Sequence, residues 1–263
     1  MKITRNLYRC STITWVVYSF VLMGTLSSCI SRKYLSDLKT DYSLQPGLLK
    51  GYLTLQELPS SLALLSPPPD EGSVAFQLDE EITRKYLTPV DSLRWDQAVK
   101  DSDLEFPEAI SSFVAIVQIP IDEKNTPYLY LLLQRSLTDA ILSTYSAKNF
   151  YKRVRPFMIN EGSTCTPYAE AHMNDGSYPS GHAAVGWAWA LILSELFPRE
   201  TNKLIDRGRA FGDSRVVCNV HWQSDVEAGR FMGAATVARL HANPNFRADL
   251  EKARKEVSEQ SRK

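Results

Sequence analysis

Three short clusters in the sequence contain the residue types that a site for phosphoryl transfer needs. A phosphoryl group in transfer requires cations for its oxygens, hydrogen-bond donors to hold it, a nucleophile and a proton source. The clusters supply three cationic side chains, a serine hydroxyl, a glycine backbone and two histidines, one of which precedes an aspartate by four residues. Their members are Lys148, Arg155 and Pro156; Pro179, Ser180, Gly181 and His182; and Ser214, Arg215, His221 and Asp225.

Lys148 and Arg155 are candidates for binding phosphate oxygens. They lie seven residues apart, so a helix that continued through both would place them on one face, and Pro156 would end that helix. Arginine offers planar, bidentate donors to phosphate, whereas lysine offers a point charge. The alternative for this segment is a solvated basic helix end, because Lys152 and Arg153 lie there too.

The second cluster predicts an anion site at the start of a helix. Gly181 allows a ligand to approach the backbone closely, and Ser180 offers a hydroxyl while capping the helix that follows. A helix N-terminus suits an anion. His182, at the first turn, could give a proton to a leaving oxygen. The alternative is a plain Pro-Ser-Gly turn followed by a surface histidine.

The third cluster combines a histidine with a carboxylate one helical turn away. Asp225 could accept a hydrogen bond from Nδ1–H of His221 and leave Nε2 as a nucleophile. Arg215 adds a third cation to the set. The alternative is a surface pair at i and i+4. His172 and His241 lack such neighbours and are expected to be structural or surface residues.

The hydrophobic pattern indicates that helices position these clusters. Apolar residues recur at helical spacing from about residue 74 onward, and alternation with a period of two is scarce. We therefore expect an all-α fold, a single helical-bundle domain of about nine helices. The expected helices cover residues 74–87, 90–99, 106–119, 127–152, 182–197, 200–212, 221–240 and 243–258.

The N-terminus reads as a targeting segment. Residues 1–28 combine a basic start with a short apolar stretch, which is typical of a signal peptide. Leu26 to Cys29 match a bacterial lipoprotein cleavage box, so Cys29 is the expected lipidation site and the bacterial periplasm the expected location, with the protein lipid-anchored at the membrane. The alternatives are an ordinary signal peptide or an uncleaved anchor. Residues 29–73 are expected to form a tether and N-terminal wrap, and residues 74–263 the phosphate-handling domain.

Composition and cysteine count limit the remaining possibilities. The 263 residues carry a formal net charge of +0, which gives no electrostatic footprint for nucleic acid. Cys10 would leave with the signal peptide and Cys29 would carry lipid, so Cys165 and Cys218 remain as a pair. In an exported protein such a pair favours a disulfide, worth about 4 kcal/mol on the loop-entropy model. Two buried free thiols are the alternative.

The three clusters together resemble the signature of the type 2 phosphatidic acid phosphatase superfamily: Lys-x6-Arg-Pro, Pro-Ser-Gly-His and Ser-Arg-x5-His-x3-Asp. Every fixed position and both internal spacings match. Residues 94–101, residues 218–225 and the Gly-Ser-Tyr before Pro179 are similar in particular to the class A bacterial nonspecific acid phosphatases. The resemblance spans about residues 74–255. Ala183 departs from it, because class A members often carry threonine there, and this affects only fine substrate preference.

The resemblance implies a fold, an activity and a role for each matched residue. The fold is the all-α one shared with vanadium haloperoxidases, and the activity is metal-independent hydrolysis of phosphomonoesters, with no cofactor. His221 would attack phosphorus and form a phosphohistidine, Asp225 would orient His221, and His182 would protonate the leaving alcohol. The phosphoryl oxygens would be held by Lys148, Arg155, Ser180, the Gly181 N–H and Arg215.

Other functions on the same residues stay open at this point. The expected substrates are small phosphomonoesters such as nucleotides and sugar phosphates, and the phosphohistidine could also be attacked by another alcohol. A vanadium-dependent haloperoxidase would use the same residues for vanadate, although such enzymes are generally longer. A lipid phosphatase would be expected to carry transmembrane helices, and a non-catalytic phosphate-binding lipoprotein would need no proton donor. The sequence also leaves open whether the protein is a homo-oligomer.

Overall fold

The computed structural model describes residues 48–87, 91–160, 162–165 and 175–262. Within these ranges all regular secondary structure is helical, which confirms the all-α expectation. Residues 51–263 form one compact unit. The expected signal peptide, residues 1–28, and the expected lipidation site, Cys29, lie outside the described residues. None of the described helices combines the length and the apolar character needed to cross a membrane.

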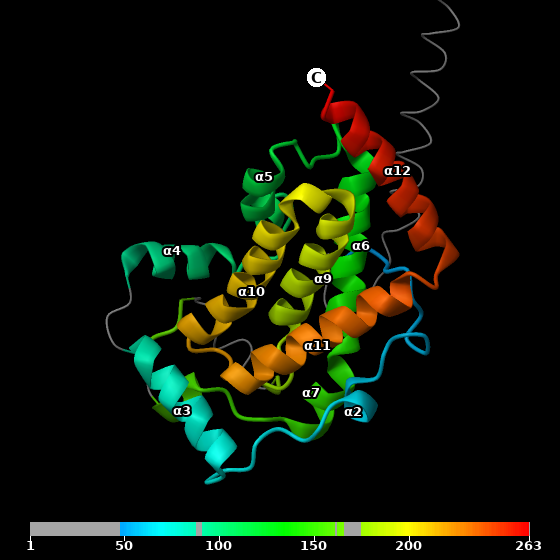
Figure 1. Cartoon of the computed structure of the whole chain (residues 1–263). Helices are drawn as coiled ribbons and strands as arrows, with labels where there is room; N and C mark the ends of the chain where they lie inside the picture. Colours follow the sequence, from blue (N-terminus) through cyan, green and yellow to red (C-terminus); the bar gives the residue numbers. More distant parts are fainter. Residues whose placement is uncertain (1–47, 88–90, 161, 166–174, 263) are drawn as a thin grey trace, which may run out of the picture. The chain divides into compact units, whose positions relative to one another are not determined.

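Figure 1 shows the helices coloured in chain order. The expected helices near residues 74, 90, 182, 221 and 243 are confirmed by α3, α4, α9, α11 and α12. The expected helix over 106–119 is shorter, because a 3-10 turn at Glu108–Ile110 precedes α5. The bounds are α2 Ser61–Leu64, α3 Val74–Leu87, α4 Ser92–Lys100, α5 Ser111–Val117, α6 Pro127–Ser143, α7 Tyr145–Tyr151, α8 Phe157–Asn160, α9 Gly181–Leu196, α10 Thr201–Val217, α11 Gln223–Leu240 and α12 Pro244–Gln260.

Helix α9 is the central element and packs against α6, α10 and α11 (Figure 1). It can be central because most of its residues are small or apolar, and Trp189 on it is fully buried. The ring of Trp189 contacts Phe113 of α5 and Phe211 of α10 at centroid distances of 6.1 and 5.8 Å. A Cβ on Gly229 of α11 would lie 2.3 Å from the Ser180 carbonyl oxygen. Only glycine therefore allows α11 to approach the start of α9 so closely.

The expected single helix over residues 127–152 is wrong, because the structure divides it at Thr144 into α6 and α7. The hydroxyls of Ser143 and Thr144 donate to the carbonyls of Ala140 and Ile141 at 2.8 and 2.7 Å. Such side-chain bonds compete with the helical backbone pattern. Thr144 therefore ends α6, and α7 starts in a separate turn that carries Lys148.

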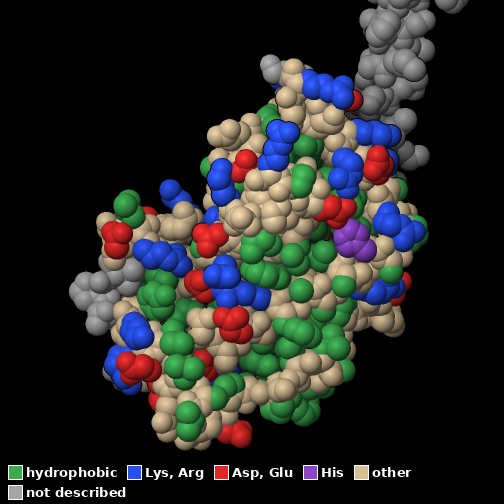
Figure 2. All heavy atoms as spheres, in the orientation of Figure 1, with side chains coloured by type: hydrophobic (Ala, Val, Ile, Leu, Met, Phe, Trp, Pro, Cys, Tyr) green, Lys and Arg blue, Asp and Glu red, His purple; other side chains and the backbone are tan. Residues whose placement is uncertain are grey.

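The segment between residue 51 and α3 lies along the helices of the bundle. The Tyr52 and Leu53 N–H groups donate to the buried carboxylate of Asp139 on α6 at 2.8 and 3.1 Å. Burial raises the pKa of Asp139 to about 7. Further along, the segment and helices α3 and α11 border a groove of about 550 Å³, whose lining includes Leu64 and Phe231. Figure 2 shows hydrophobic side chains gathered over α11 and its surroundings.

Candidate active site

The end of α10 brings Arg215 and His221 together. Helix α10 runs past the expected end at Gly212, so Arg215 lies in its last turn. Asn219 then adopts a left-handed conformation with φ 60°. The N–H groups of Val220 and His221 donate to the Arg215 carbonyl at 3.1 and 3.3 Å, an arrangement of the Schellman type. This turn accounts for the spacing of six residues between the arginine and the histidine.

Two neighbours fix the orientation of the His221 ring. Its Nδ1 lies 3.4 Å from Oδ2 of Asp225, and its Nε2 lies 3.3 Å from Nη1 of Arg155. A guanidinium only donates hydrogen bonds and a carboxylate only accepts them. The geometry therefore favours the tautomer with the proton on Nδ1 and a lone pair on Nε2.

Burial and three cations keep His221 neutral. Burial contributes most, followed by the charges of Arg155, Lys148 and Arg215, and together they hold the pKa of His221 well below 6.5. A neutral imidazole retains the lone pair that a nucleophile requires. The structure thus brings His221, Asp225 and the three cations together.

Lys148 and Arg155 converge on this site, but one continuous helix does not carry both. Helix α7 ends at Tyr151 because Lys152 adopts a left-handed conformation with φ 46°, so the expectation of a shared helix face is wrong. Lys148 Nζ instead donates to the Gly176 carbonyl at 2.7 Å. Arg155 Nη1 donates to the Val220 carbonyl at 2.8 Å, which holds its guanidinium beside His221.

Gly176 permits the close contact at Lys148. A Cβ on this residue would lie 2.4 Å from the Lys148 carbonyl oxygen, so a larger residue would separate the two segments. Burial, and secondarily the charge of Arg155, lower the pKa of Lys148 to about 7. An anion at the site would compensate for the cost of placing this ammonium beside other cations.

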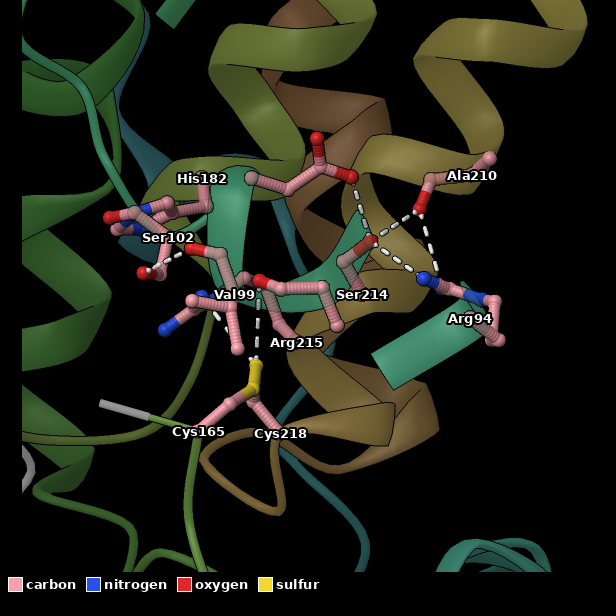
Figure 3. The surroundings of a disulfide bond; sticks show 11 residues. Arg94, Val99, Ser102, Cys165, His182, Ala210, Ser214, Arg215 and Cys218 are labelled. Atoms are coloured by element: carbon pink, nitrogen blue, oxygen red, sulfur yellow. Dashed lines mark hydrogen bonds between the residues drawn. A yellow bond between two sulfur atoms is a disulfide. The ribbon is translucent and has the colours of Figure 1, made fainter. Parts of the chain in front are cut away.

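Arg215 is buried beside the disulfide that joins Cys165 and Cys218 (Figure 3). Its Nη1 lies 3.8 Å from Sγ of Cys218. Its Nε finds no hydrogen-bond partner among the described residues. Burial and the charge of Arg155 lower its pKa to about 10. A buried donor without an acceptor is costly, and a phosphoryl oxygen is an acceptor that suits it.

The start of α9 presents the expected second cluster. The Ser180 hydroxyl caps the helix by accepting from the Ala183 N–H, and the Ser180 N–H donates to the Asp225 carbonyl at 2.9 Å. A Cβ on Gly181 would meet nothing closer than the Thr144 hydroxyl at 3.8 Å, so space is open there. The Nε2 of His182 lies 3.1 Å from the Ser102 carbonyl, and the pair is visible in Figure 3. Because a carbonyl only accepts, Nε2 carries a proton.

Ser214 has different hydrogen-bond partners from its neighbour Arg215. Its hydroxyl donates to Asp101 at 2.6 Å and accepts from Arg94 at 2.9 Å (Figure 3). Arg207 also pairs with Asp101. Ser214 thus fastens the end of α4 to α10, next to the Ser102 carbonyl that contacts His182.

Three side chains for which the sequence predicts no role contact Asp225 directly or through one partner. The Ser177 hydroxyl and Arg153 both donate to its carboxylate, and Asp79 of α3 pairs with Arg153. From the sequence, Arg153 is expected only to belong to a solvated basic helix end. The signal that could have identified it is its position two residues before Arg155, since neighbours at i and i+2 of an irregular segment can point the same way. The sequence offers no comparable signal for Asp79.

The other two histidines are His172 and His241. His241 is partly exposed and lies 3.3 Å from a carboxylate oxygen of Glu195, which is consistent with the expected surface role. His172 lies outside the described residues. Among the residues that the structure describes, no group of three or more His, Cys, Asp or Glu side chains is arranged to hold a metal ion.

Comparisons with known proteins identify relatives of this chain. Residues 127–248 match the model of the PAP2 superfamily. The chain is 41% identical over 220 residues to a non-specific acid phosphatase of Providencia stuartii, covering 83% of this chain and 88% of that protein. It is 40% identical over 208 residues to a non-specific acid phosphatase of Salmonella typhimurium, covering 78% and 83% of the two chains.

A solved structure with a similar backbone is a bacterial vanadium-dependent iodoperoxidase. The TM-score is 0.49 at 15% identity, covering 68% of this chain and 52% of that one. The alignments to the two phosphatases extend over most of both chains. The chain therefore belongs to the PAP2 superfamily and, within it, to the bacterial non-specific acid phosphatases, which are phosphomonoester hydrolases.

Proposed function

We propose that the protein hydrolyses phosphomonoesters without a metal ion, through a phosphohistidine on His221. The observation that carries this proposal is the orientation of the His221 ring, with Nδ1 toward Asp225 and Nε2 toward Arg155. A nucleophile for phosphorus must present a lone pair where cations stabilise the phosphoryl oxygens, and Nε2 meets both conditions.

In the first step, Nε2 of His221 forms a bond to phosphorus while the bond from phosphorus to the ester oxygen breaks. The leaving oxygen takes a proton from His182, whose Nε2–H donates to the Ser102 carbonyl, so we assign the transferred proton to Nδ1. Asp225 stabilises the positive charge that develops on His221. The oxygens are held by Lys148, Arg155, Ser180, the Gly181 N–H and Arg215.

In the second step, a water molecule attacks the phosphohistidine and gives a proton to His182. The bond between phosphorus and Nε2 breaks, and inorganic phosphate leaves. An alcohol in place of water would yield a new phosphomonoester, so phosphotransfer belongs to the same proposal. Since the named groups bind only the phosphoryl part, we expect broad acceptance of small esters such as nucleotides and sugar phosphates.

We further propose that the protein is exported to the bacterial periplasm and anchored by lipid on Cys29. The support is the basic and apolar stretch of residues 1–28 followed by the cleavage box at Leu26 to Cys29. Incorporation of labelled palmitate in the wild-type protein, and its loss in Cys29→Ala, would test the anchor. Label that persists in the variant would exclude Cys29 as the acceptor.

The enzymatic proposal is tested with an aromatic phosphomonoester in excess EDTA, with and without vanadate. Chelator-resistant turnover that vanadate inhibits, together with acid-labile phosphate on the wild-type protein and none on His221→Ala, supports it. Turnover that EDTA abolishes would contradict the metal-independent step. Bromide oxidation in vanadate and peroxide without phosphatase turnover would identify a haloperoxidase, and activity confined to lipid phosphates would identify a lipid phosphatase.

A further inference from the structure

Arg153 occupies a buried position between two carboxylates from different helices. Its Nη1 donates to Oδ1 of Asp225 at 2.6 Å, and its Nη2 donates to Oδ2 of Asp79 at 2.8 Å. The side chains of Arg153, Asp225 and Asp79 are only 8%, 0% and 3% exposed. Solvent therefore screens these ion pairs little.

The surroundings of Arg153 fix the plane of its guanidinium. Its carbon lies 5.8 Å from the ring centroid of Phe76 and 5.4 Å from that of Trp222. Asp79 is itself held, because it accepts the Ser224 N–H at 2.9 Å and the Ser224 hydroxyl at 2.5 Å. Helix α3 is thereby fastened to the first turn of α11, which contains Asp225.

The two oxygens of Asp225 have separate partners. Oδ2 faces Nδ1 of His221 and accepts from the Trp222 N–H at 2.9 Å and from the Ser177 hydroxyl. Oδ1 accepts from Arg153. Removal of the guanidinium would leave Oδ1 of this buried carboxylate without its charged donor, which favours rotation of that group. A rotated carboxylate would no longer be a dependable acceptor for Nδ1–H of His221.

We propose that Arg153 is a positioning residue for the reaction: it holds the Asp225 carboxylate with Oδ2 toward His221, and Asp79 holds Arg153 in place. The inference rests on the proposed function of His221 as nucleophile. Arg153 and Arg155 thus act on opposite ends of the pair that His221 and Asp225 form. Arg155 faces Nε2 of His221, where phosphorus binds, and Arg153 faces the far oxygen of Asp225.

The first test compares Arg153→Met with Arg153→Lys in the full chain. We expect Arg153→Met to slow phosphoenzyme formation about 100-fold, as loss of an orienting partner does in other catalytic pairs. The dissociation constant of inorganic phosphate, measured by calorimetry, should stay within about threefold, because the oxygens are held by other residues. Arg153→Lys should recover about tenfold of the rate by restoring one charged donor.

Variants at Asp79 and at a distant arginine complete the experiment. Asp79→Asn should slow phosphoenzyme formation less than Arg153→Met, and the double variant should be no slower than Arg153→Met alone, because both changes act through one chain of contacts. Arg135→Met is the matched control: Arg135 is buried, pairs with Asp249 at 3.3 Å and lies over a tyrosine ring. It should lose thermal stability and keep the rate of phosphoenzyme formation.

A readout without substrate separates this inference from the function on which it rests. The ¹⁵N shifts of His221 should show the proton on Nδ1 in the wild-type protein and a mixture of tautomers in Arg153→Met. Such a change supports the role of Arg153 even if no phosphoenzyme is trapped. The same tautomer in both proteins, or a loss of phosphate affinity as large as the loss of rate, would overturn the proposal and leave the assignment of His221 untouched.

Discussion

Nη1 of Arg155 lies 3.3 Å from Nε2 of His221, so a fixed cation faces the nitrogen that carries the lone pair. In most proteins a cation beside histidine would only be unfavourable, because it opposes protonation of the ring. At His221 this opposition to protonation is useful, because a nucleophile needs a neutral ring. Burial and the surrounding cations hold the pKa of His221 well below 6.5, so the ring stays neutral in mildly acidic solution. The same cations provide the partners for the phosphoryl oxygens.

Replacement of His182 by alanine should slow the hydrolysis of alkyl phosphates more than that of aryl phosphates. Only a poor leaving oxygen needs a proton in the transition state, so we expect a loss of about 10²- to 10⁴-fold for an alkyl ester. The measurement is kcat/KM for both esters in the wild type and in the variant. His241→Ala, at the partly exposed pair with Glu195, serves as control. Equal losses for the two esters would remove His182 as the proton donor.

The contribution of Lys148 should depend on pH. Its pKa of about 7 means that the ammonium is present below this pH and is lost as the pH rises through it. The ratio of kcat/KM between the wild type and Lys148→Ala should therefore be large at pH 5 and should fall toward one above pH 8. Ionisation of the substrate affects both proteins and cancels in the ratio. A ratio that stays constant across this range would mean that Lys148 remains charged throughout.

The left-handed turn at Asn219 should affect both the stability of the fold and the placement of His221. Asn219→Ala should be less stable than Asn219→Gly by about 1 kcal/mol, because alanine pays the steric cost of positive φ and glycine does not. Both variants lose the amide contact with Asn160 at 2.8 Å, so their difference isolates the backbone. Denaturant unfolding and kcat/KM are the measurements. Identical values for the two variants would show that the turn relaxes without penalty.

The bridge between Cys165 and Cys218 should stabilise the fold. It spans a separation of 53 residues, so the double variant Cys165→Ser/Cys218→Ser should lose about 4 kcal/mol of the free energy of unfolding. Because Cys218 also contacts Arg215, affinity for phosphate should fall as well. Urea unfolding with and without reductant tests the first effect. A wild-type midpoint that reductant leaves unchanged would favour two free thiols.

Much of the site follows from the sequence because its spacings are local. The spacing from Arg215 to His221 is that of a helix end followed by a left-handed turn, and Asp225 lies in the first turn of α11, where its carboxylate accepts the N–H of Trp222, the residue after His221. Ser180 caps its own helix. Hydrogen bonds between near neighbours in the chain set all three relations, so residue type and spacing predict them. The helical character of the domain likewise follows from periodic apolar residues.

Tertiary packing decided the rest. Helix α7 ends at Lys152 because this residue adopts a left-handed conformation, which its residue type does not predict. The break directs Arg153 and Arg155 toward different partners. Asp79 reaches Arg153 only because α3 packs against the start of α11. These contacts join residues that are far apart in the chain, and their free energy comes from burial and from charges paired across helices. A sequence pattern records which residues can make such pairs, whereas the fold determines which of them meet.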